Sequence, residues 1–188
     1  MSKLGVTPSQ TVGPYFAIGL TWDDGADVVP QGTDGAFWIR GRVTDGNGAP
    51  IPDAVVETWQ ADRDGRFAHP DDPRGAVDWG VFRGLGRSGT DDDGRYGIYT
   101  IKPGRVPGQN GTTQAPHIDV TVMARGMLKR LVTRIYFPEE EAANAADPVL
   151  SSLPATAASE TLMAIKSDDG YSFDIHLQGE NETVFFDL

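Results

Sequence analysis

Residues 37–60, FWIRGRVTDGNGAPIPDAVVETWQ, contain two apolar-rich segments separated by turn-forming residues. The first segment, 37–44, ends at the turn sequence DGNG (45–48). The second segment, 54–60, follows Ile-Pro-Asp at 51–53. Clusters of Gly, Pro, Asn and Asp around short apolar runs are typical of strands joined by turns. We therefore predict two β-strands here.

Similar patterns recur along the rest of the chain. We expect further strands at 96–101, 118–124, 128–137, 171–178 and 183–186, and one short helix at 155–165, where Leu162 and Ile165 would share a face. The connection 62–89 is longer than is usual in a compact domain, and such connections often carry function. Many short strands without an alternating strand and helix pattern predict an all-β, antiparallel β-sandwich.

The length of 188 residues is enough for one domain with its own hydrophobic core. With 23 Gly and 13 Pro, the chain favours turns over long helices. We expect an N-terminal arm and acidic loop at 1–34 and a single β-sandwich domain at 35–188.

The charge balance excludes several functions. Sixteen Lys and Arg against 27 Asp and Glu give a net charge of −11, which would repel a nucleic acid over most of the surface. The chain has no Cys, so disulfides, thiolate nucleophiles and Cys-ligated metal clusters are excluded. Neither a signal peptide nor a run of about 20 apolar residues is present, and we expect a cytoplasmic location.

The segment 41–56 and the later segment 90–96 together resemble the transthyretin-like, or prealbumin-like, Greek-key sandwich. This resemblance implies a fold but no activity, because one fold can carry many different functions.

A second resemblance is carried by six motifs in order. They are TPSQTVGPY (7–15), VETWQAD (56–62), TIKPG (100–104), APHID (115–119), TRIYF (133–137) and the C-terminal segment 179–188. Together they are similar to the family of intradiol ring-cleaving dioxygenases. The resemblance implies a non-heme iron oxidoreductase that cleaves aromatic rings bearing two neighbouring hydroxyls.

Members of that family hold a ferric ion with two tyrosines and two histidines. The resemblance places the first tyrosine at Phe67 and the second at Val106, and it places the histidine pair at His117 and Asp119. Neither Phe67 nor Val106 has an oxygen that could bind iron. The resemblance therefore implies a chain with a vestigial iron site, no metal and no catalytic residues of its own, paired with a homologous subunit that holds Fe³⁺.

The resemblance also implies that this chain lines the partner's substrate pocket, through the arm residues Thr11, Gly13, Pro14 and Tyr15 and through Arg134. An arginine can form a charge-assisted, bidentate pair with a substrate carboxylate. Gly-Pro permits a close backbone approach in a fixed bend. Such contacts would position the substrate without taking part in bond chemistry.

Two alternatives remain open from the residues. One is a non-catalytic, prealbumin-like carrier or scaffold, since that fold requires no chemistry. The other is an iron(II) oxygenase in which His117, Asp119 and His176 form a two-histidine, one-carboxylate site. The second lacks the arginine expected soon after the last histidine. His69, next to Pro70, is expected to be an exposed loop residue.

Overall fold

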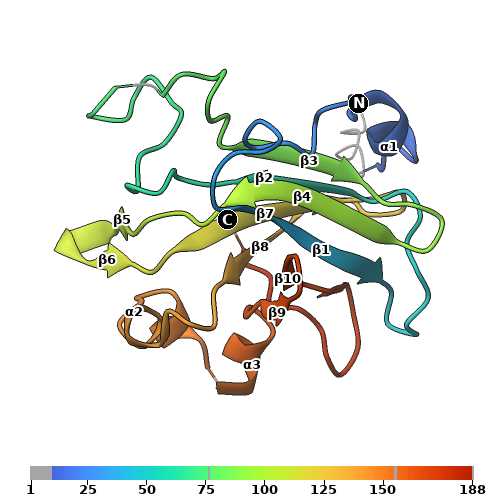
Figure 1. Cartoon of the computed structure of the whole chain (residues 1–188). Helices are drawn as coiled ribbons and strands as arrows, with labels where there is room; N and C mark the ends of the chain where they lie inside the picture. Colours follow the sequence, from blue (N-terminus) through green and yellow to red (C-terminus); the bar gives the residue numbers. More distant parts are fainter. Residues whose placement is uncertain (1–9, 76, 155, 188) are drawn as a thin grey trace, which may run out of the picture.

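Two β-sheets packed face to face form the body of the protein, shown as a computed structural model in Figure 1. The structure describes residues 10–75, 77–154 and 156–187. One sheet contains β1 (Ala36–Thr44), β4 (Arg95–Ile101), β9 (Ile165–Ser167), β10 (Gly170–Ser172) and β11 (Ile175–His176). The other contains β3 (Leu85–Gly89), β2 (Val55–Trp59), β7 (His117–Met123) and β8 (Leu131–Tyr136), in that order. A small hairpin of β5 (Val106–Pro107) and β6 (Thr113–Gln114) extends from one end. The predicted β-sandwich is confirmed.

Alternation along β7 shows why these segments become strands. Ile118, Val120 and Val122 are fully buried between the sheets, while Asp119 and Thr121 on the other face are partly exposed. Successive side chains of a strand point to opposite faces, so this spacing buries one apolar row. The main core joins such rows from both sheets.

Five of the predicted strands form close to the expected positions, as β1, β2, β4, β7 and β8. The prediction for 171–178 was too long, because the strand is interrupted between β10 and β11, where the Asp174 carboxylate accepts the Arg42 backbone N–H at 2.9 Å. The strand predicted at 183–186 was wrong. That tail is held by single hydrogen bonds, such as the one from Phe186 N to Val132 O at 2.8 Å. The connection 62–89 contains the unpredicted strand β3, whose sequence LGRSG has almost no apolar pattern.

The helices also differ from the prediction. The described residues form three short α-helices instead of one, namely α1 (Tyr15–Gly19), α2 (Glu141–Ala145) and α3 (Thr156–Glu160), with 3-10 turns η1 (Gln109–Gly111) and η2 (Leu150–Ser152). The predicted helix 155–165 ends at Glu160; its first residue lies outside the described residues. Leu162 is fully buried whereas Ile165 is 71% exposed on β9, so the two do not share a face. Leu162 and Ala164 form backbone hydrogen bonds with Tyr136 instead of helical ones, so the helix does not continue through them.

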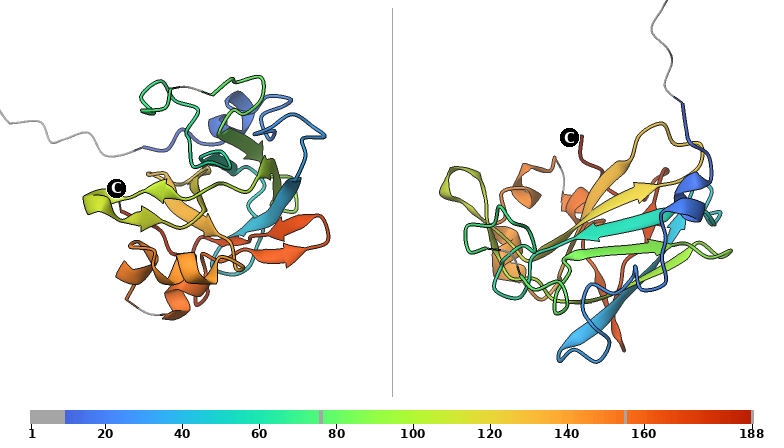
Figure 2. Two further views of the ribbon diagram at one scale, coloured as in Figure 1. Left: turned by 60° about the vertical axis from the view of Figure 1, so that its left-hand side comes forward. Right: turned by 90° about the horizontal axis from the view of Figure 1, so that it is seen from above.

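The region containing α2 and α3 packs along one edge of the sandwich (Figures 1 and 2). A second, smaller apolar cluster joins it to the sheets and contains Ala115, Tyr136, Ala143 and Leu162. This cluster fixes the end of β8, which carries Arg134 two residues before Tyr136.

The predicted antiparallel arrangement is incomplete, because β1 pairs in parallel with β10 and β11. At Gly41 the carbonyl oxygen of Phe173 approaches so closely that an added Cβ would lie 1.7 Å from it. The Tyr96 hydroxyl donates a hydrogen bond to the same carbonyl at 2.7 Å. Glycine is required at position 41 because only a residue without a side chain permits this approach.

The acidic segment 22–34 is not a free loop. Val28 and Val29 are buried in the main core, and the Val28 N–H donates to the Tyr99 carbonyl at 2.9 Å. The 1–34 and 35–188 division remains a prediction, although these contacts show that both parts share a core; residues 1–9 lie outside the described residues. Within the described part of the chain, no helix has the length and apolar character to cross a membrane.

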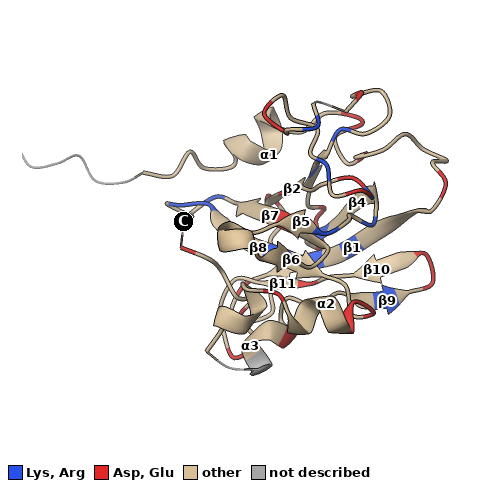
Figure 3. Cartoon of the chain, turned by 90° about the vertical axis from the view of Figure 1, so that its left-hand side faces the viewer, with Lys and Arg blue, Asp and Glu red and all other residues tan. Residues whose placement is uncertain are grey.

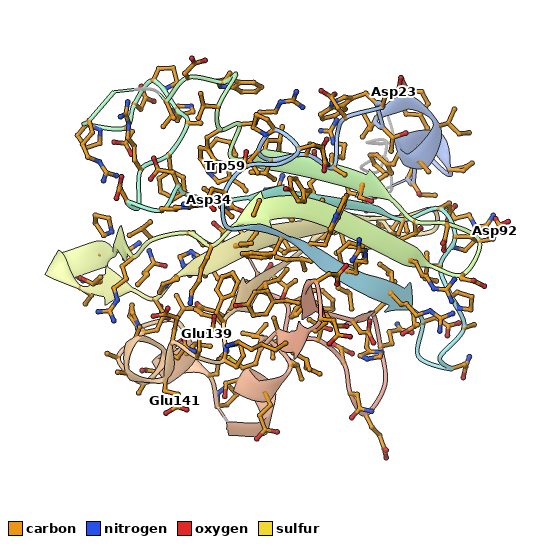
Figure 4. The ribbon with its side chains drawn as sticks, viewed as in Figure 1. Asp23, Asp34, Trp59, Asp92, Glu139 and Glu141 are labelled. Carbon is orange, nitrogen blue, oxygen red and sulfur yellow. The ribbon has the colours of Figure 1, made fainter. Side chains whose placement is uncertain are left out.

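A charged cluster links β4 to the segment after β8. Glu139 lies between the sheets and α2 (Figure 4), where Lys102 Nζ contacts its Oε1 at 2.8 Å and the Tyr171 hydroxyl donates to the same oxygen. Burial opposes ionisation of Glu139, but the hydrogen bonds from Lys102 and Tyr171 outweigh it and lower its pKa to about 2. The carboxylate is therefore ionised through most of the acid range.

We expect Lys102→Met to reduce the free energy of unfolding by about 1 kcal/mol at pH 7. The folded pKa of Glu139 lies below the ordinary value of 4.5 for a glutamate, so the stabilisation is complete above pH 4.5 and is lost as pH falls toward 2. The difference between variant and wild type should thus shrink over that range in urea unfolding. Lys166→Met, at an exposed lysine of β9, is the control. A difference that does not change with pH would contradict the assignment.

Candidate functional site

The first predicted vestigial position, Phe67, lies in the long connection after β2. Its ring stacks on Trp59, with 6.0 Å between ring centroids and 9° between planes. Trp59 lies at the end of β2 (Figure 4). Both rings line a cavity of about 650 Å³ that also includes Pro73 and Pro107. This cavity offers apolar surface at the position where the resemblance places an iron-binding phenolate.

Val106, the second vestigial position, is buried on β5 and pairs with Gln114 on β6. Gly65 adopts φ +75°, and an added Cβ there would lie 2.0 Å from the Arg105 carbonyl oxygen and 3.8 Å from Val106. The hairpin therefore packs against the segment that carries Phe67. The two apolar replacements lie in neighbouring segments at the same end of the sandwich.

His117 is buried at the start of β7. Its Nδ1 lies 2.7 Å from the Ala115 carbonyl oxygen, which can only accept, so Nδ1 carries the proton in the neutral ring. Its ring centroid is 5.7 Å from that of Tyr136. Burial and the nearby Arg134 charge lower the pKa of His117, leaving the imidazole neutral at pH 7.

Asp119 binds Arg134 rather than presenting a free carboxylate. Its Oδ1 accepts from Arg134 Nε at 2.8 Å across the β7–β8 pair, while His117 Nε2 is 3.9 Å away. Among residues 10–75, 77–154 and 156–187, no three His, Asp or Glu side chains form a group able to hold a metal ion. The donors present at the four vestigial positions therefore do not fit a ferric ion.

The iron(II) alternative is not supported, because the structure does not assemble its three residues. His176 lies on β11, where its Nδ1 is 2.8 Å from the Thr44 hydroxyl, and it lines a different cavity with Glu160 and Glu180. His117 and Asp119 lie on β7 in the opposite sheet. His69 is exposed, as predicted.

Arg134 is the centre of a hydrogen-bond network that connects three elements. Its Nη1 donates to Gln114 Oε1 at 2.7 Å and to the Tyr136 hydroxyl at 3.3 Å. Burial disfavours its charge, but the interactions with Asp119 and Tyr136 together outweigh that effect and raise the pKa of Arg134. The guanidinium therefore remains charged although its side chain is only 19% exposed.

Asp147 anchors the other side of this network. Its carboxylate is fully buried and accepts hydrogen bonds from the backbone N–H groups of Ala115, Val149 and Leu150, at 2.7, 2.8 and 3.0 Å. The Tyr136 hydroxyl donates to it at 3.3 Å. Burial raises the pKa of Tyr136, so this hydroxyl keeps its proton.

Arg134 also lines a cavity of about 480 Å³ between the β5–β6 hairpin and the segment after α2. Polar residues dominate its wall, including Asn110, Thr112, Gln114 and Ser152. A half-buried arginine in such a cavity can bind a carboxylate.

The arm residues lie elsewhere. Thr11 lines a small cavity of about 100 Å³ with the turn between β7 and β8, which is at the opposite end of these strands from His117. Gly13 has φ +64° and donates its N–H to the Thr11 hydroxyl at 3.2 Å, and after Pro14 the exposed Tyr15 begins α1. Within this chain the arm and Arg134 line separate cavities, and their predicted substrate contacts remain predictions.

Three residues of the Arg134 network were not predicted, namely Gln114, Tyr136 and Asp147. Asp147 did carry a signal, since it precedes Pro148 and Asp-Pro favours the start of a turn. Gln114 and Tyr136 are recognisable only once the register of β7 and β8 is known.

Acidic residues lie along the loops and in the region of α2 and α3 (Figure 3). Arg134 is paired with the Asp119 carboxylate, in a chain with net charge −11.

Comparison with known proteins gives one family. The family model described as "Dioxygenase" matches residues 12–179. The chain is 41% identical to the protocatechuate 3,4-dioxygenase alpha chain of Burkholderia cepacia over 202 residues, covering 100% of both chains. It is 39% identical to the alpha chain of Pseudomonas putida, covering 97% of this chain and 96% of that one.

It is also 36% identical to the protocatechuate 3,4-dioxygenase beta chain of Burkholderia cepacia, over 77% of this chain and 65% of that one. Among solved structures, the dioxygenase domain of a carbohydrate-binding fusion protein from Streptomyces sp. SirexAA-E matches with a TM-score of 0.56 and 27% identity, covering 92% and 98% of the two chains. Catechol 1,2-dioxygenase from Pseudomonas arvilla C-1 shares the fold, with a TM-score of 0.60 at 22% identity, over 82% of this chain and 56% of that one.

Proposed function

This chain belongs to the intradiol dioxygenase family, and from that membership we propose that it is the alpha subunit of a protocatechuate 3,4-dioxygenase. The assembled enzyme would use O₂ to cleave 3,4-dihydroxybenzoate between its hydroxylated carbons, giving 3-carboxy-cis,cis-muconate. Full-length similarity to alpha chains, together with similarity to a beta chain, supports a hetero-oligomer of homologous subunits.

The single observation that supports iron binding by the beta subunit alone is the chemistry of the vestigial positions. Enzymes of this family are non-heme iron enzymes, yet here Phe67 and Val106 have no donor atom and Asp119 is paired with Arg134. In our proposal the beta subunit holds Fe³⁺ and this chain holds none.

This chain would then contribute substrate positioning. The charged guanidinium of Arg134 would bind the substrate carboxylate. The Gly13–Pro14 bend lies near the β7–β8 turn, away from the Arg134 cavity, so within one copy of the chain it would line a different pocket wall. Fixing the carboxylate end of a flat substrate orients its two hydroxyls toward the partner, which lowers the entropic cost of reaching the reactive geometry.

Purification of this chain with and without its homologous subunit tests the proposal. We expect the chain alone to contain no stoichiometric iron and to consume no O₂ with 3,4-dihydroxybenzoate, and the complex to do both. Ring cleavage by the isolated, iron-loaded chain would overturn the assignment. If no homologous subunit co-purifies after co-expression, the carrier or scaffold interpretation is favoured instead.

A further inference from the structure

The position of the Arg134 guanidinium is fixed from two directions. Asp119 Oδ1 accepts from Nε at 2.8 Å, and Gln114 Oε1 accepts from Nη1 at 2.7 Å. These acceptors come from β7 and β6, so the arginine on β8 is held by two other elements of the chain. A guanidinium is planar, and two acceptors on different nitrogens determine its plane.

Gln114 is itself oriented. Its Nε2 donates to the Pro107 carbonyl at 3.3 Å across the β5–β6 hairpin, which turns Oε1 toward Arg134. The amide therefore presents its acceptor, and not its donor, to the cation.

His117 does not compete for Asp119. Its Nδ1 proton is used by the Ala115 carbonyl, and its Nε2 lies 3.9 Å from Asp119, beyond hydrogen-bond distance. The Asp119 carboxylate is thus available to Arg134.

These hydrogen bonds leave one guanidinium nitrogen of Arg134, Nη2, without a partner among the described residues. The hydrogen bonds of its guanidinium within the described residues use Nε and Nη1, and Arg134 lines the polar cavity described above. A carboxylate in that cavity could accept from Nη2 without breaking either bond.

We propose that Asp119 and Gln114 are positioning residues that hold Arg134 with Nη2 free for the carboxylate of the aromatic substrate. This inference rests on the proposed function and deepens it, because it makes discrimination between carboxylated and uncarboxylated catechols depend on the Asp119–Arg134–Gln114 arrangement.

The test uses the assembled enzyme and two substrates, 3,4-dihydroxybenzoate and catechol, which lacks the carboxylate. We expect Asp119→Ala to raise the KM for 3,4-dihydroxybenzoate about tenfold, equivalent to about 1.4 kcal/mol, with kcat nearly unchanged. The KM for catechol should stay within twofold. Asp119→Asn keeps an oxygen acceptor for Nε and should restore much of the loss. Gln114→Ala should give a smaller increase of about threefold, equivalent to about 0.6 kcal/mol.

A double-mutant cycle gives the decisive measurement. If Asp119 acts only through Arg134, then Asp119→Ala should add little to the KM of an Arg134→Ala enzyme. Asp24→Ala is the matched control, since Asp24 also pairs with an arginine, Arg83, at 2.5 Å. It should leave both KM values unchanged.

Equal KM increases for both substrates, or additive effects in the cycle, would overturn the positioning role. If Arg134→Ala raises the KM but Asp119→Ala does not, this inference fails while the proposed function stands. If the wild-type complex does not cleave 3,4-dihydroxybenzoate, the proposed function itself fails.

Discussion

Replacement of Arg134 by alanine in the assembled enzyme should weaken binding of 3,4-dihydroxybenzoate by about 1.5–3 kcal/mol, the range for a hydrogen bond to a charged group. This corresponds to an increase in KM of about 10- to 150-fold. The iron content should not change, because Arg134 binds Asp119, Gln114 and Tyr136 in this chain rather than a metal. Steady-state O₂ uptake and iron analysis of the purified complex provide the two measurements.

Arg134→Lys separates charge from geometry. Lysine keeps a positive charge but cannot occupy both the Asp119 and Gln114 acceptors with a planar group, so it should recover only part of the loss. An unchanged KM in Arg134→Ala, with a correctly assembled complex, would show that this arginine does not contact substrate.

The second large effect is expected on stability, from Asp147→Ala. The change leaves three backbone N–H groups and the Tyr136 hydroxyl without their acceptor. Asp147, Ala115 and Tyr136 are buried, whereas Val149 and Leu150 are partly buried. Each unsatisfied buried donor costs about 1–3 kcal/mol. Relaxation of the segment after α2 offsets part of this, and we expect a loss of about 3–5 kcal/mol, within the range for removal of one buried charged partner.

Denaturant unfolding followed by tryptophan fluorescence measures this loss. Asp147→Asn retains Oδ1 as an acceptor but replaces Oδ2, which accepts from the Ala115 N–H. It should therefore lower the free energy of unfolding by less, about 1–2 kcal/mol. Asp92→Ala, in the exposed turn before β4, should change stability by less than about 0.5 kcal/mol. Equal unfolding midpoints for Asp147→Ala and Asp92→Ala would contradict the anchoring role.

The strands with a regular apolar period were predictable from the sequence. In β7, for example, Ile118, Val120 and Val122 specify both the strand and its buried face. In contrast, β3 has no such pattern, and its Gly86 lies against Thr58 and Val28, so that strand is defined by its neighbours. The end of α3 is likewise set by backbone hydrogen bonds that Leu162 and Ala164 form with Tyr136, a residue distant from them in the sequence.

Single residues of the site could be predicted from the sequence, but the contacts between them could not. The resemblance identified Phe67, Val106 and Arg134 individually, but the pairing of Asp119 with Arg134 depends on the β7–β8 register. The contribution of Gln114 depends on a separate hairpin, and that of Asp147 on a loop. Local sequence patterns carry no information on contacts of this kind, which form only when distant elements pack.

The parallel pairing of β1 has a consequence for biosynthesis. Arg42 and Thr44 bond to Asp174 and His176, partners 132 positions later in the chain. Loop closure over such a distance is slow, and contacts of this range favour late folding. On the ribosome, one edge of β1 can therefore pair only after residues 170–176 have emerged, so a nascent chain that stops before residue 170 could not complete its first sheet.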